Sequence, residues 1–227
     1  MITTPLESYS ICPNESQFIY RGFERVHRSV ECKIKRLIDI MGALVGLAIT
    51  ALIAIPIAIA IQFDNPGPIL YSQVRCGVNG KTFTIRKFRS MVIDADRKKH
   101  LVKNEAQGFI FKNKQDPRVT RIGRFLRSTS LDEFPQFWNV LKGEMSLVGT
   151  RPPTPDEVVR YESYHWKRLH VKPGLTGEWQ TRGRSSVKDF NEIVAMDLDY
   201  QRQWSVAYDL QLIFKTIWVV FAGKGAC

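Results

Sequence analysis

One long apolar segment dominates the pattern of hydrophobic and polar positions in this chain. From Leu37 to Phe63 apolar side chains occupy every side of a helix, and only three polar residues interrupt the run: Asp39, Thr50 and Gln62. The run exceeds the ~20 residues that an α-helix needs to cross the hydrocarbon core of a bilayer. A helix that is apolar all round belongs in a membrane or in a large core, and a chain of 227 residues has little room for such a core. We therefore expect a membrane-embedded helix here.

The charges around this segment predict that both of its ends lie on the same side of the membrane. Lys33, Lys35 and Arg36 come directly before it, and a strongly basic region follows it. Positively charged flanks tend to remain in the cytoplasm, which one straight span cannot satisfy at both ends. A helix that enters the bilayer, bends and returns can do so. The step from Ile55 to Pro56 provides the bend, because proline removes an i→i−4 hydrogen bond.

A second apolar pattern lies near the C-terminus and leaves two interpretations open. Its large side chains recur at helical spacing: Leu210, Ile213, Phe214, Ile217, Trp218 and Phe221. An amphipathic helix of this kind can rest on lipid headgroups, with Trp204 and Trp218 as anchors at the interface. The same spacing is equally typical of a helix that packs into the core of a domain.

The rest of the chain predicts a small mixed domain in which helices dominate. Ile69–Val74 and Lys81–Ile85 have the composition of strands, and the turn residues between them, Gly77 to Gly80, predict a hairpin. Helices are expected over 94–107, 132–141 (ending at Gly143), 156–169 and 187–203. The predicted fold class is mixed α/β, helix-dominated. It has three parts: an N-terminal arm (1–33), a re-entrant membrane helix (34–64), and a cytoplasmic domain with short strands and interfacial amphipathic helices (65–227).

The charge of the chain is concentrated in one region. The sequence has 33 Lys and Arg residues against 22 Asp and Glu residues, a formal net charge of +11. Between Lys81 and Arg127 there are fourteen basic residues and only four acidic ones. Such a region implies an anionic partner, but composition does not choose between nucleic acid, lipid headgroups and a phosphorylated substrate. The phenylalanines here are spaced for core packing rather than for stacking on bases, which argues against nucleic acid.

Other patterns that suggest a metal site carry little weight. The four cysteines are scattered without C-x-x-C spacing, so neither a zinc site nor a disulfide framework is indicated. His165 and His170 lack the spacing of ligands, and a surface or packing role is expected for them. Nucleotide-sugar glycosyltransferases often hold a metal with a D-x-D pattern, which also arises often by chance. The pattern occurs twice, at Asp94-x-Asp96 and Asp197-x-Asp199.

The most informative stretch is SLDEFPQ (130–136), which places two adjacent carboxylates, Asp132 and Glu133, among many cations. Nearby positive charge favours the ionised form of a carboxyl group. An ionised aspartate can attack phosphorus or bind a hard metal ion. The alternative is a capping box, with Ser130 as N-cap, Glu133 reaching back to it, and Asp132 complementing the helix dipole. The motif alone is compatible with both interpretations.

Five sequence blocks, taken together, resemble one known family. They are NPGPILYSQVR (65–75), KFRSM (87–91), SLDEFPQ (130–136), LVGTRP (147–152) and KPGLTG (172–177). In this order they are similar to the bacterial sugar transferases, the monotopic polyprenyl-phosphate phosphoglycosyl transferases, over roughly Lys35 to Phe221. The resemblance implies the compact form of the family, a re-entrant helix, and a place on the cytoplasmic face of the bacterial inner membrane. A small residue commonly precedes the proline in that family, whereas Ile55 stands there in this chain.

The resemblance also implies a reaction and its residues. Asp132 would be the nucleophile that attacks a UDP-sugar, releases UMP and forms a phosphosugar–aspartyl intermediate, which polyprenyl (undecaprenyl) phosphate then displaces. Glu133, with Asp132, would be on the side of a Mg²⁺ ion. Cations assigned to the substrate phosphates are Lys87, Arg89, Arg127, Arg151 and Arg184.

Two alternative functions remain at this stage: a membrane-anchored, metal-dependent glycosyltransferase using D-x-D, and a non-catalytic protein that binds anionic lipid or nucleic acid. The preferred partners are a UDP-sugar, polyprenyl phosphate and membrane lipids, with no nucleic acid. The sequence leaves a homo-oligomer, the sugar and the polysaccharide pathway open.

Overall fold

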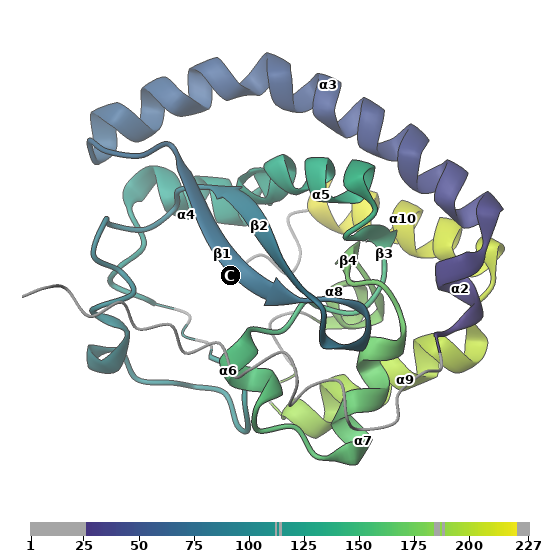
Figure 1. Ribbon diagram of the computed structural model, residues 1–227. Coiled ribbons are helices and arrows are strands. Elements are labelled where there is room, and N and C mark those ends of the chain that lie inside the picture. Colours follow the sequence, from purple (N-terminus) through teal and green to yellow (C-terminus); the bar gives the residue numbers. More distant parts are fainter. Residues whose placement is uncertain (1–25, 112, 114, 184–186, 188, 222–227) are drawn as a thin grey trace, which may run out of the picture.

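The computed structural model describes residues 26–111, 113, 115–183, 187 and 189–221, and one long helix arches over a mixed α/β body (Figure 1). This helix, α3 (Lys33–Asp64), has 32 residues. Within the described part of the chain it is the helix that is long and apolar enough, by length and composition, to cross a membrane. The short α2 (Arg28–Glu31) leads into it. The predicted apolar helix is confirmed, and it begins one residue earlier than expected.

At the predicted bend, α3 curves but does not break, and it runs continuously through Pro56 (Figure 1). Ile55 and Pro56 are both exposed. The proline ring lacks the N–H that would bond the carbonyl of Leu52, and it crowds that carbonyl. A helix therefore bends away from its proline, which here leaves Pro56 on the convex, uncovered side.

One side of α3 packs on the body, and the charged residues Lys35 and Asp39 of this helix face this side. Lys35 Nζ donates to Asp209 Oδ2 at 2.5 Å and to the Val148 carbonyl at 3.0 Å, and both charged side chains are buried. Asp39 Oδ1 accepts from the Ser146 hydroxyl and from the following backbone N–H, each at 2.9 Å. An unpaired polar group in an apolar environment costs several kcal/mol. These contacts therefore fix the rotation of α3 about its axis.

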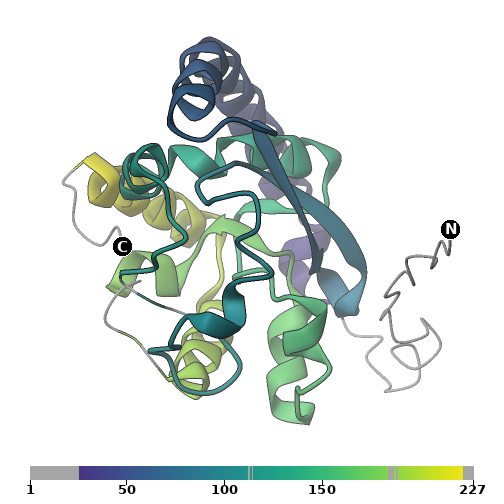
Figure 2. The ribbon, with the colours of Figure 1, turned by 90° about the vertical axis from the view of Figure 1, so that its left-hand side faces the viewer.

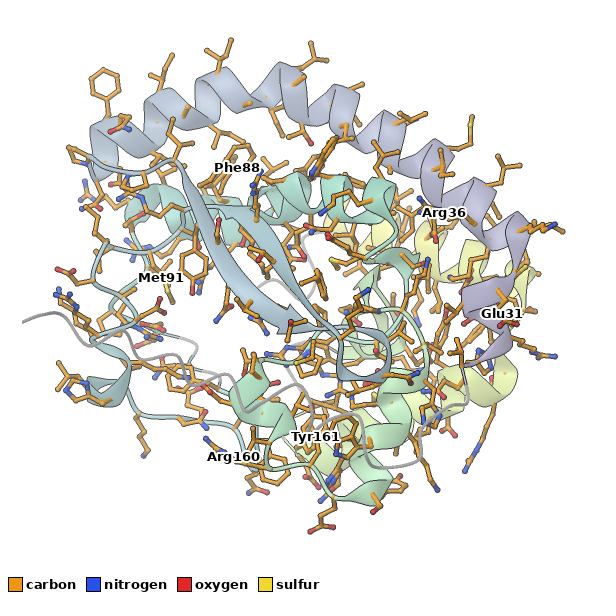
Figure 3. All side chains as sticks on the ribbon, in the orientation of Figure 1. Glu31, Arg36, Phe88, Met91, Arg160 and Tyr161 are labelled. Atoms are coloured by element: carbon orange, nitrogen blue, oxygen red, sulfur yellow. The ribbon has the colours of Figure 1, made fainter. Side chains whose placement is uncertain are left out.

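The other side of α3 is uncovered. In Figure 2, turned by 90°, α3 again lies at the edge of the molecule, outside the helices beneath it. Side chains along the outer side of the arch point away from the body (Figure 3). The exposed large apolar residues of α3 include Leu37, Met41, Leu44, Val45, Leu52, Ile59 and Phe63.

Both ends of α3 are fastened to the same body. Near the C-terminal end, the Asp64 carboxylate accepts from the backbone N–H of Ile122 at 2.9 Å, in the first turn of α4 (Arg121–Ser128). Arg89 donates from both terminal nitrogens to Asn65, the residue after α3. Phe88 lies beneath the arch and packs against its inner side (Figure 3).

The predicted hairpin is confirmed and is longer than expected. β1 (Leu70–Cys76) pairs antiparallel with β2 (Thr82–Phe88), with Tyr71 opposite Lys87. The short 3₁₀-helix η1 (Val78–Gly80) closes the turn, in which Asn79 and Gly80 have φ of 52° and 80°. Glycine and asparagine are the residues that enter this left-handed region most readily.

A second, parallel pair of strands brings two of the sequence blocks together. β3 (Ser146–Val148) pairs with β4 (Gly174–Thr176), and Thr150 bridges to Pro173 beyond them. A Cβ on Gly149 would lie 2.1 Å from the carbonyl oxygen of Lys172, and one on Gly174 would lie 2.1 Å from the Gly149 nitrogen. Only glycine permits this close approach of the two backbones.

Helices make up most of the remaining body. They are η2 (Lys99–Leu101), η3 (Leu131–Gln136), α5 (Phe137–Lys142), α6 (Pro155–Val158), α7 (Ser163–Trp166), η4 (Lys167–His170), α8 (Glu178–Gly183), α9 (Phe190–Gln203) and α10 (Val206–Phe221). The prediction for 187–203 is confirmed as α9, with Asp189 as its N-cap. The helix predicted over 132–141 is a 3₁₀-helix followed by α5, which ends at Gly143 as expected.

Two predicted helices are wrong because side chains claim the backbone groups that a helix would need. Over 94–107 only η2 forms, since Arg118 takes the carbonyl of Ala95 and the Asn104 amide takes groups of its own loop. Over 156–169 the chain breaks into α6, α7 and η4, because His165 Nδ1 accepts the N–H of Glu162 and restarts the helix there. Local side-chain hydrogen bonds of this kind compete directly with helices.

One side of α10 packs into the body, as the core interpretation expected, while the interfacial interpretation of its other, exposed side stays a prediction. Leu212 is buried in the body, whereas Phe214 and Trp218 are 68% and 74% exposed. The prediction that Trp204 anchors the interface is wrong. Trp204 is buried and its Nε1 donates to Asp209 Oδ2 at 3.0 Å, so it belongs to the network around Lys35. The expected packing role of His165 is confirmed, since its ring is buried among the aromatic rings of the core.

Candidate active site

The two adjacent carboxylates lie on η3, which packs against β2 of the hairpin. Lys87, on β2, donates from Nζ to Glu133 Oε1 at 2.9 Å. Asp132 is 7% exposed and lies in the first turn of η3. The structure thus brings together the predicted nucleophile, its neighbouring carboxylate and one predicted cation.

The capping-box interpretation of this motif is wrong. Ser130 makes no side-chain capping hydrogen bond, and its φ of 57° places it in the left-handed region. Glu133 bonds Lys87 with its side chain, as described above. A non-glycine residue in this region costs of order 1–3 kcal/mol, and such residues cluster at functional sites. A capping box does occur elsewhere, where Thr154 and Glu157 bond each other's backbone at the start of α6.

α4 carries Arg127 toward Asp132 because a glycine lets the helix approach the end of β2. A Cβ on Gly123 would lie 1.9 Å from the carbonyl oxygen of Ser90. One turn further along the same face, Arg127 Nε donates to the Ser90 hydroxyl at 2.9 Å. Burial lowers the pKa of Arg127, and the charge of Asp132 acts in the opposite direction. The Arg127 guanidinium is therefore partly dehydrated and feels the charge of Asp132.

Arg151 follows β3 and is held by a fork of two hydrogen bonds. Its Nη1 and Nη2 donate to the two carboxylate oxygens of Glu157 at 2.9 and 3.1 Å. Burial is the largest single influence on Glu157 and alone would raise its pKa, but the charge and hydrogen bonds of Arg151, together with the charges of Arg75 and Arg168, lower the pKa below its ordinary value. Arg168, fully buried and paired with Asp197, donates to the backbone carbonyl of Arg151 at 3.3 Å. This arrangement fixes the direction of the Arg151 side chain.

Two of the predicted phosphate-binding residues are not part of this arrangement as described. Arg89 uses both terminal nitrogens of its guanidinium on Asn65, at the end of α3. Arg184 lies outside the described residues.

Three polar residues of β1 were missed at the sequence level. Tyr71, Gln73 and Arg75 alternate along the strand, so they share the face that also carries Lys87. The Tyr71 hydroxyl donates to Asp96 Oδ2 at 3.2 Å, and burial, together with Asp96, raises the pKa of Tyr71 to about 12. The alternation of the three residues in the strand was the signal that could have identified them.

The two D-x-D patterns are used by the fold. Asp197 is buried and pairs with Arg168, whereas Asp199 pairs with Arg202 at the surface. Asp96 accepts from Tyr71. In neither pattern do these contacts bring the two carboxylates to one shared partner, as a metal site would require.

The comparison with known proteins agrees with the motifs. The sequence profile of the family described as "Bacterial sugar transferase" matches residues 30–223.

The chain belongs to the bacterial sugar transferase family.

Relatives in this family include proteins with named activities. The chain is 50% identical over 194 residues to the "Galactosyl transferase CpsE" of Streptococcus agalactiae, and this match covers 85% of this chain and 43% of that protein. It is 38% identical over 203 residues to the "UDP-glucose:undecaprenyl-phosphate glucose-1-phosphate transferase" of Escherichia coli, covering 85% of this chain and 41% of that one. It is 38% identical over 198 residues to the "Exopolysaccharide production protein ExoY" of Sinorhizobium fredii, and this match covers 85% of this chain and 87% of that protein. The chain thus spans less than half the length of the first two relatives and most of the third.

The donor set of this bacterial sugar transferase suits Mg²⁺ only if the substrate contributes to its binding. Within the described residues, no three His, Cys, Asp or Glu side chains are grouped as a metal site. Asp132 and Glu133 offer carboxylate oxygens, the donors that Mg²⁺ prefers, and Mg²⁺ commonly binds one or two protein carboxylates together with substrate phosphates. The adjacent pair fits a magnesium ion of that kind.

Removing Arg151 should destabilise the protein in a pH-dependent way. Glu157 has a pKa below its ordinary value of 4.5, so its contribution to stability is present above pH 4.5 and is lost as pH falls through the lower folded value. In Arg151→Met a buried carboxylate remains without its partner, which costs about 3–5 kcal/mol. We expect the loss of unfolding temperature to be largest at neutral pH and to shrink as pH falls through the lowered folded pKa of Glu157, because its carboxyl group is then protonated in both proteins. Thermal unfolding in detergent from pH 3.5 to 7.5 measures this, and a loss that is independent of pH would contradict it.

Proposed function

We propose that the protein is a phosphoglycosyl transferase that moves a sugar-1-phosphate from a UDP-sugar to polyprenyl (undecaprenyl) phosphate and releases UMP. The observation that carries this proposal is the buried Asp132 beside the Lys87–Glu133 pair and Arg127, in a chain of the bacterial sugar transferase family. The name of the Escherichia coli relative refers to both UDP-glucose and undecaprenyl phosphate. The name of the Sinorhizobium relative refers to exopolysaccharide production, so we place the reaction at the start of exopolysaccharide or glycoconjugate synthesis.

The reaction requires two displacements at one phosphorus atom. In the first, a carboxylate oxygen of Asp132 bonds the phosphorus that bears the sugar, the bond to the bridging oxygen breaks, and that oxygen leaves with UMP. In the second, an oxygen of the lipid phosphate bonds the same phosphorus and the Asp132 carboxylate leaves. Each displacement is balanced without a proton donor, since phosphate and carboxylate oxygens are anionic as both nucleophiles and leaving groups.

The main barrier to this reaction is repulsion between anions. At contact distance each pair of like charges costs about 4 kcal/mol at an effective dielectric constant near 20. Lys87 beside Glu133, Arg127 at Ser90 and Arg151 on the loop after β3 are the cations that would offset this repulsion. Arginine suits this task because its planar fork matches two phosphate oxygens.

A magnesium ion bound by Asp132 and Glu133 would supply further charge neutralisation for the phosphate oxygens. Lys87, on β2, pairs with Glu133 and holds that carboxylate against the hairpin. Burial keeps the nucleophile away from bulk water.

We further propose that both ends of α3 lie on the cytoplasmic face of the bacterial inner membrane. The support is that Lys35 at one end and Asp64 at the other bond the same body, while the outer side of the arch is apolar and exposed. A helix fastened at both ends to one domain cannot place that domain on both sides of a bilayer.

Replacing the nucleophile tests the reaction. Asp132→Asn should lower UMP release by roughly a thousandfold or more, because the amide cannot attack phosphorus, while membrane association stays intact. The matched control is Asp94→Asn, which removes an exposed carboxylate of the D-x-D pattern and should leave turnover unchanged. UMP release is measured with undecaprenyl phosphate and a panel of UDP-sugars that begins with UDP-galactose and UDP-glucose.

Mass spectrometry completes this test. Wild-type protein quenched with UDP-sugar alone should carry a hexose-phosphate adduct on the peptide that contains Asp132. Near wild-type turnover by Asp132→Asn, or kinetics of a ternary complex without any adduct, would refute the mechanism.

Glu133→Gln tests the metal. The neutral amide is a weaker magnesium ligand than a carboxylate, so the variant should need more Mg²⁺ for half-maximal UMP release, and its rate should be lower. Glu105→Gln, at a partly buried carboxylate outside the described turn, serves as a control. A magnesium titration identical to that of the wild type would exclude the assigned role.

Cysteine labelling tests the topology. Val26→Cys, before α3, and Ser72→Cys, on the exposed side of β1, both provide accessible positions. A membrane-impermeant maleimide should label neither position in intact cells and both in lysed cells, with the unsubstituted chain as background. Labelling of either position from outside the cell would disprove the arrangement.

A further inference from the structure

Arg75 lies in the proposed active site without a role in the mechanism described so far. It follows Tyr71 and Gln73 on the polar face of β1, the face that carries Lys87 on the neighbouring strand. The electrostatic neighbours that act on it are Arg151, Glu157, Tyr71 and Glu133. Arg75 therefore contacts the loop that carries Arg151, through the Pro152 carbonyl, and also feels the charge of Glu133 in the carboxylate turn.

The cations around the site differ in how their charge is neutralised. Lys87 pairs with Glu133, Arg151 pairs with Glu157, and Arg168 pairs with Asp197. Arg75, by contrast, has no carboxylate within ion-pair distance in the described part of the chain. Its Nη1 donates to the Pro152 carbonyl at 2.9 Å and its Nη2 to Gln73 Oε1 at 2.6 Å, and both acceptors are neutral.

The environment of Arg75 is also unfavourable for a cation without an anion. Burial and the like charge of Arg151 lower its pKa to about 10. Its Nε is buried and has no hydrogen-bond partner among the described residues. An unsatisfied buried donor on a charged group carries a substantial free-energy cost. The binding of an anion between Arg75 and Arg151 would relieve that cost and neutralise the excess charge.

We propose that Arg75 is a phosphate-binding residue of the active site, which holds an oxyanion of the substrate jointly with Arg151. This inference rests on the proposed function and extends it to a residue on β1. Two phosphates share the required chemistry, the diphosphate of the UDP-sugar and the phosphate of the polyprenyl lipid. They enter in separate half-reactions, so kinetics can distinguish them.

A purely structural role makes a different prediction. Through its bond to the Pro152 carbonyl, Arg75 could serve only to hold the loop that carries Arg151. In that case removing its charge lowers the unfolding temperature and kcat, while ligand binding by the folded protein stays the same. A phosphate-binding role changes KM and ligand stabilisation even where the fold is kept.

The test compares Arg75→Gln with Arg86→Gln. Glutamine keeps an N–H donor for the Pro152 carbonyl but removes the charge. Arg86 is the matched control, because it is exposed on the opposite face of the same hairpin, where it pairs across the strands with Ser72. If Arg75→Gln does not fold, Arg75→Lys replaces it, which keeps the charge but loses the fork.

The first measurement is thermal stabilisation by UDP, and by inorganic pyrophosphate as a probe without a nucleoside. For Arg75→Gln we expect the UDP concentration needed for half the maximal shift to rise about 10- to 100-fold, the usual effect of losing charge-assisted hydrogen bonds. For Arg86→Gln it should change by less than about twofold. Equal stabilisation of the wild type and Arg75→Gln by both probes, with KM unchanged, would overturn the proposal.

The second measurement is steady-state kinetics with each substrate varied in turn. A raised KM for the UDP-sugar assigns Arg75 to the diphosphate, and a raised KM for polyprenyl phosphate assigns it to the lipid phosphate. A reduced kcat with both KM values unchanged supports the structural role and refutes the proposal. If the wild type releases no UMP from any UDP-sugar, the proposed function fails, while the stabilisation measurement still decides whether Arg75 binds phosphate.

Discussion

The ion pair between Lys35 and Asp209 joins the long helix α3 to α10, the last helix that the structure describes. It lies where α3, β3 and α10 meet, and Tyr200 and Trp204 also donate to Asp209. Neither charge is stable in an apolar environment alone, and breaking such a pair by removing one partner is strongly destabilising. The long apolar helix is thereby held to the body at one end, while the Asp64 bond to α4 holds the other.

This constraint extends to the candidate active site because the carboxylate turn rests directly on α3. Phe134, which follows Glu133, packs with the residues on the inner side of the arch. A Cβ on Gly46 would lie 2.4 Å from the ring of Phe137, so the helix has no side chain where that ring lies. The position of η3 is therefore set from two sides, by β2 with Lys87 and by α3 with these two rings. A nucleophile must be held to within a fraction of an ångström of its target, and two supports restrict it better than one.

How far the sequence predicts this molecule depends on which interactions decide each element. The apolar helix, the hairpin and α9 were predictable because their patterns are local and long. The segments 94–107 and 156–169 were not. In the first, Arg118, which is distant in sequence, bonds the backbone carbonyl of Ala95. In the second, the nearby His165 bonds the backbone N–H of Glu162, so that in both segments a side chain uses a backbone group that a continuous helix would need.

The candidate site was predictable in its residue types but not in all of its partners. Asp132, Glu133, Lys87 and Arg127 come together as the motifs suggested, whereas the capping box lies at Thr154 and Glu157 instead of Ser130 and Glu133. Trp204 could not be distinguished from an interfacial anchor, since its partner Asp209 is identified only once α10 is in place.

The outer side of α3 finally bears on how a very hydrophobic acceptor could be used. One helix thickness, about 10 Å, separates the turn that carries Asp132 from whatever covers that side. In the proposed reaction the isoprenoid tail would therefore remain in hydrocarbon while only its headgroup reached the protein, so the roughly 0.8 kcal/mol needed to expose each methylene to water would never arise.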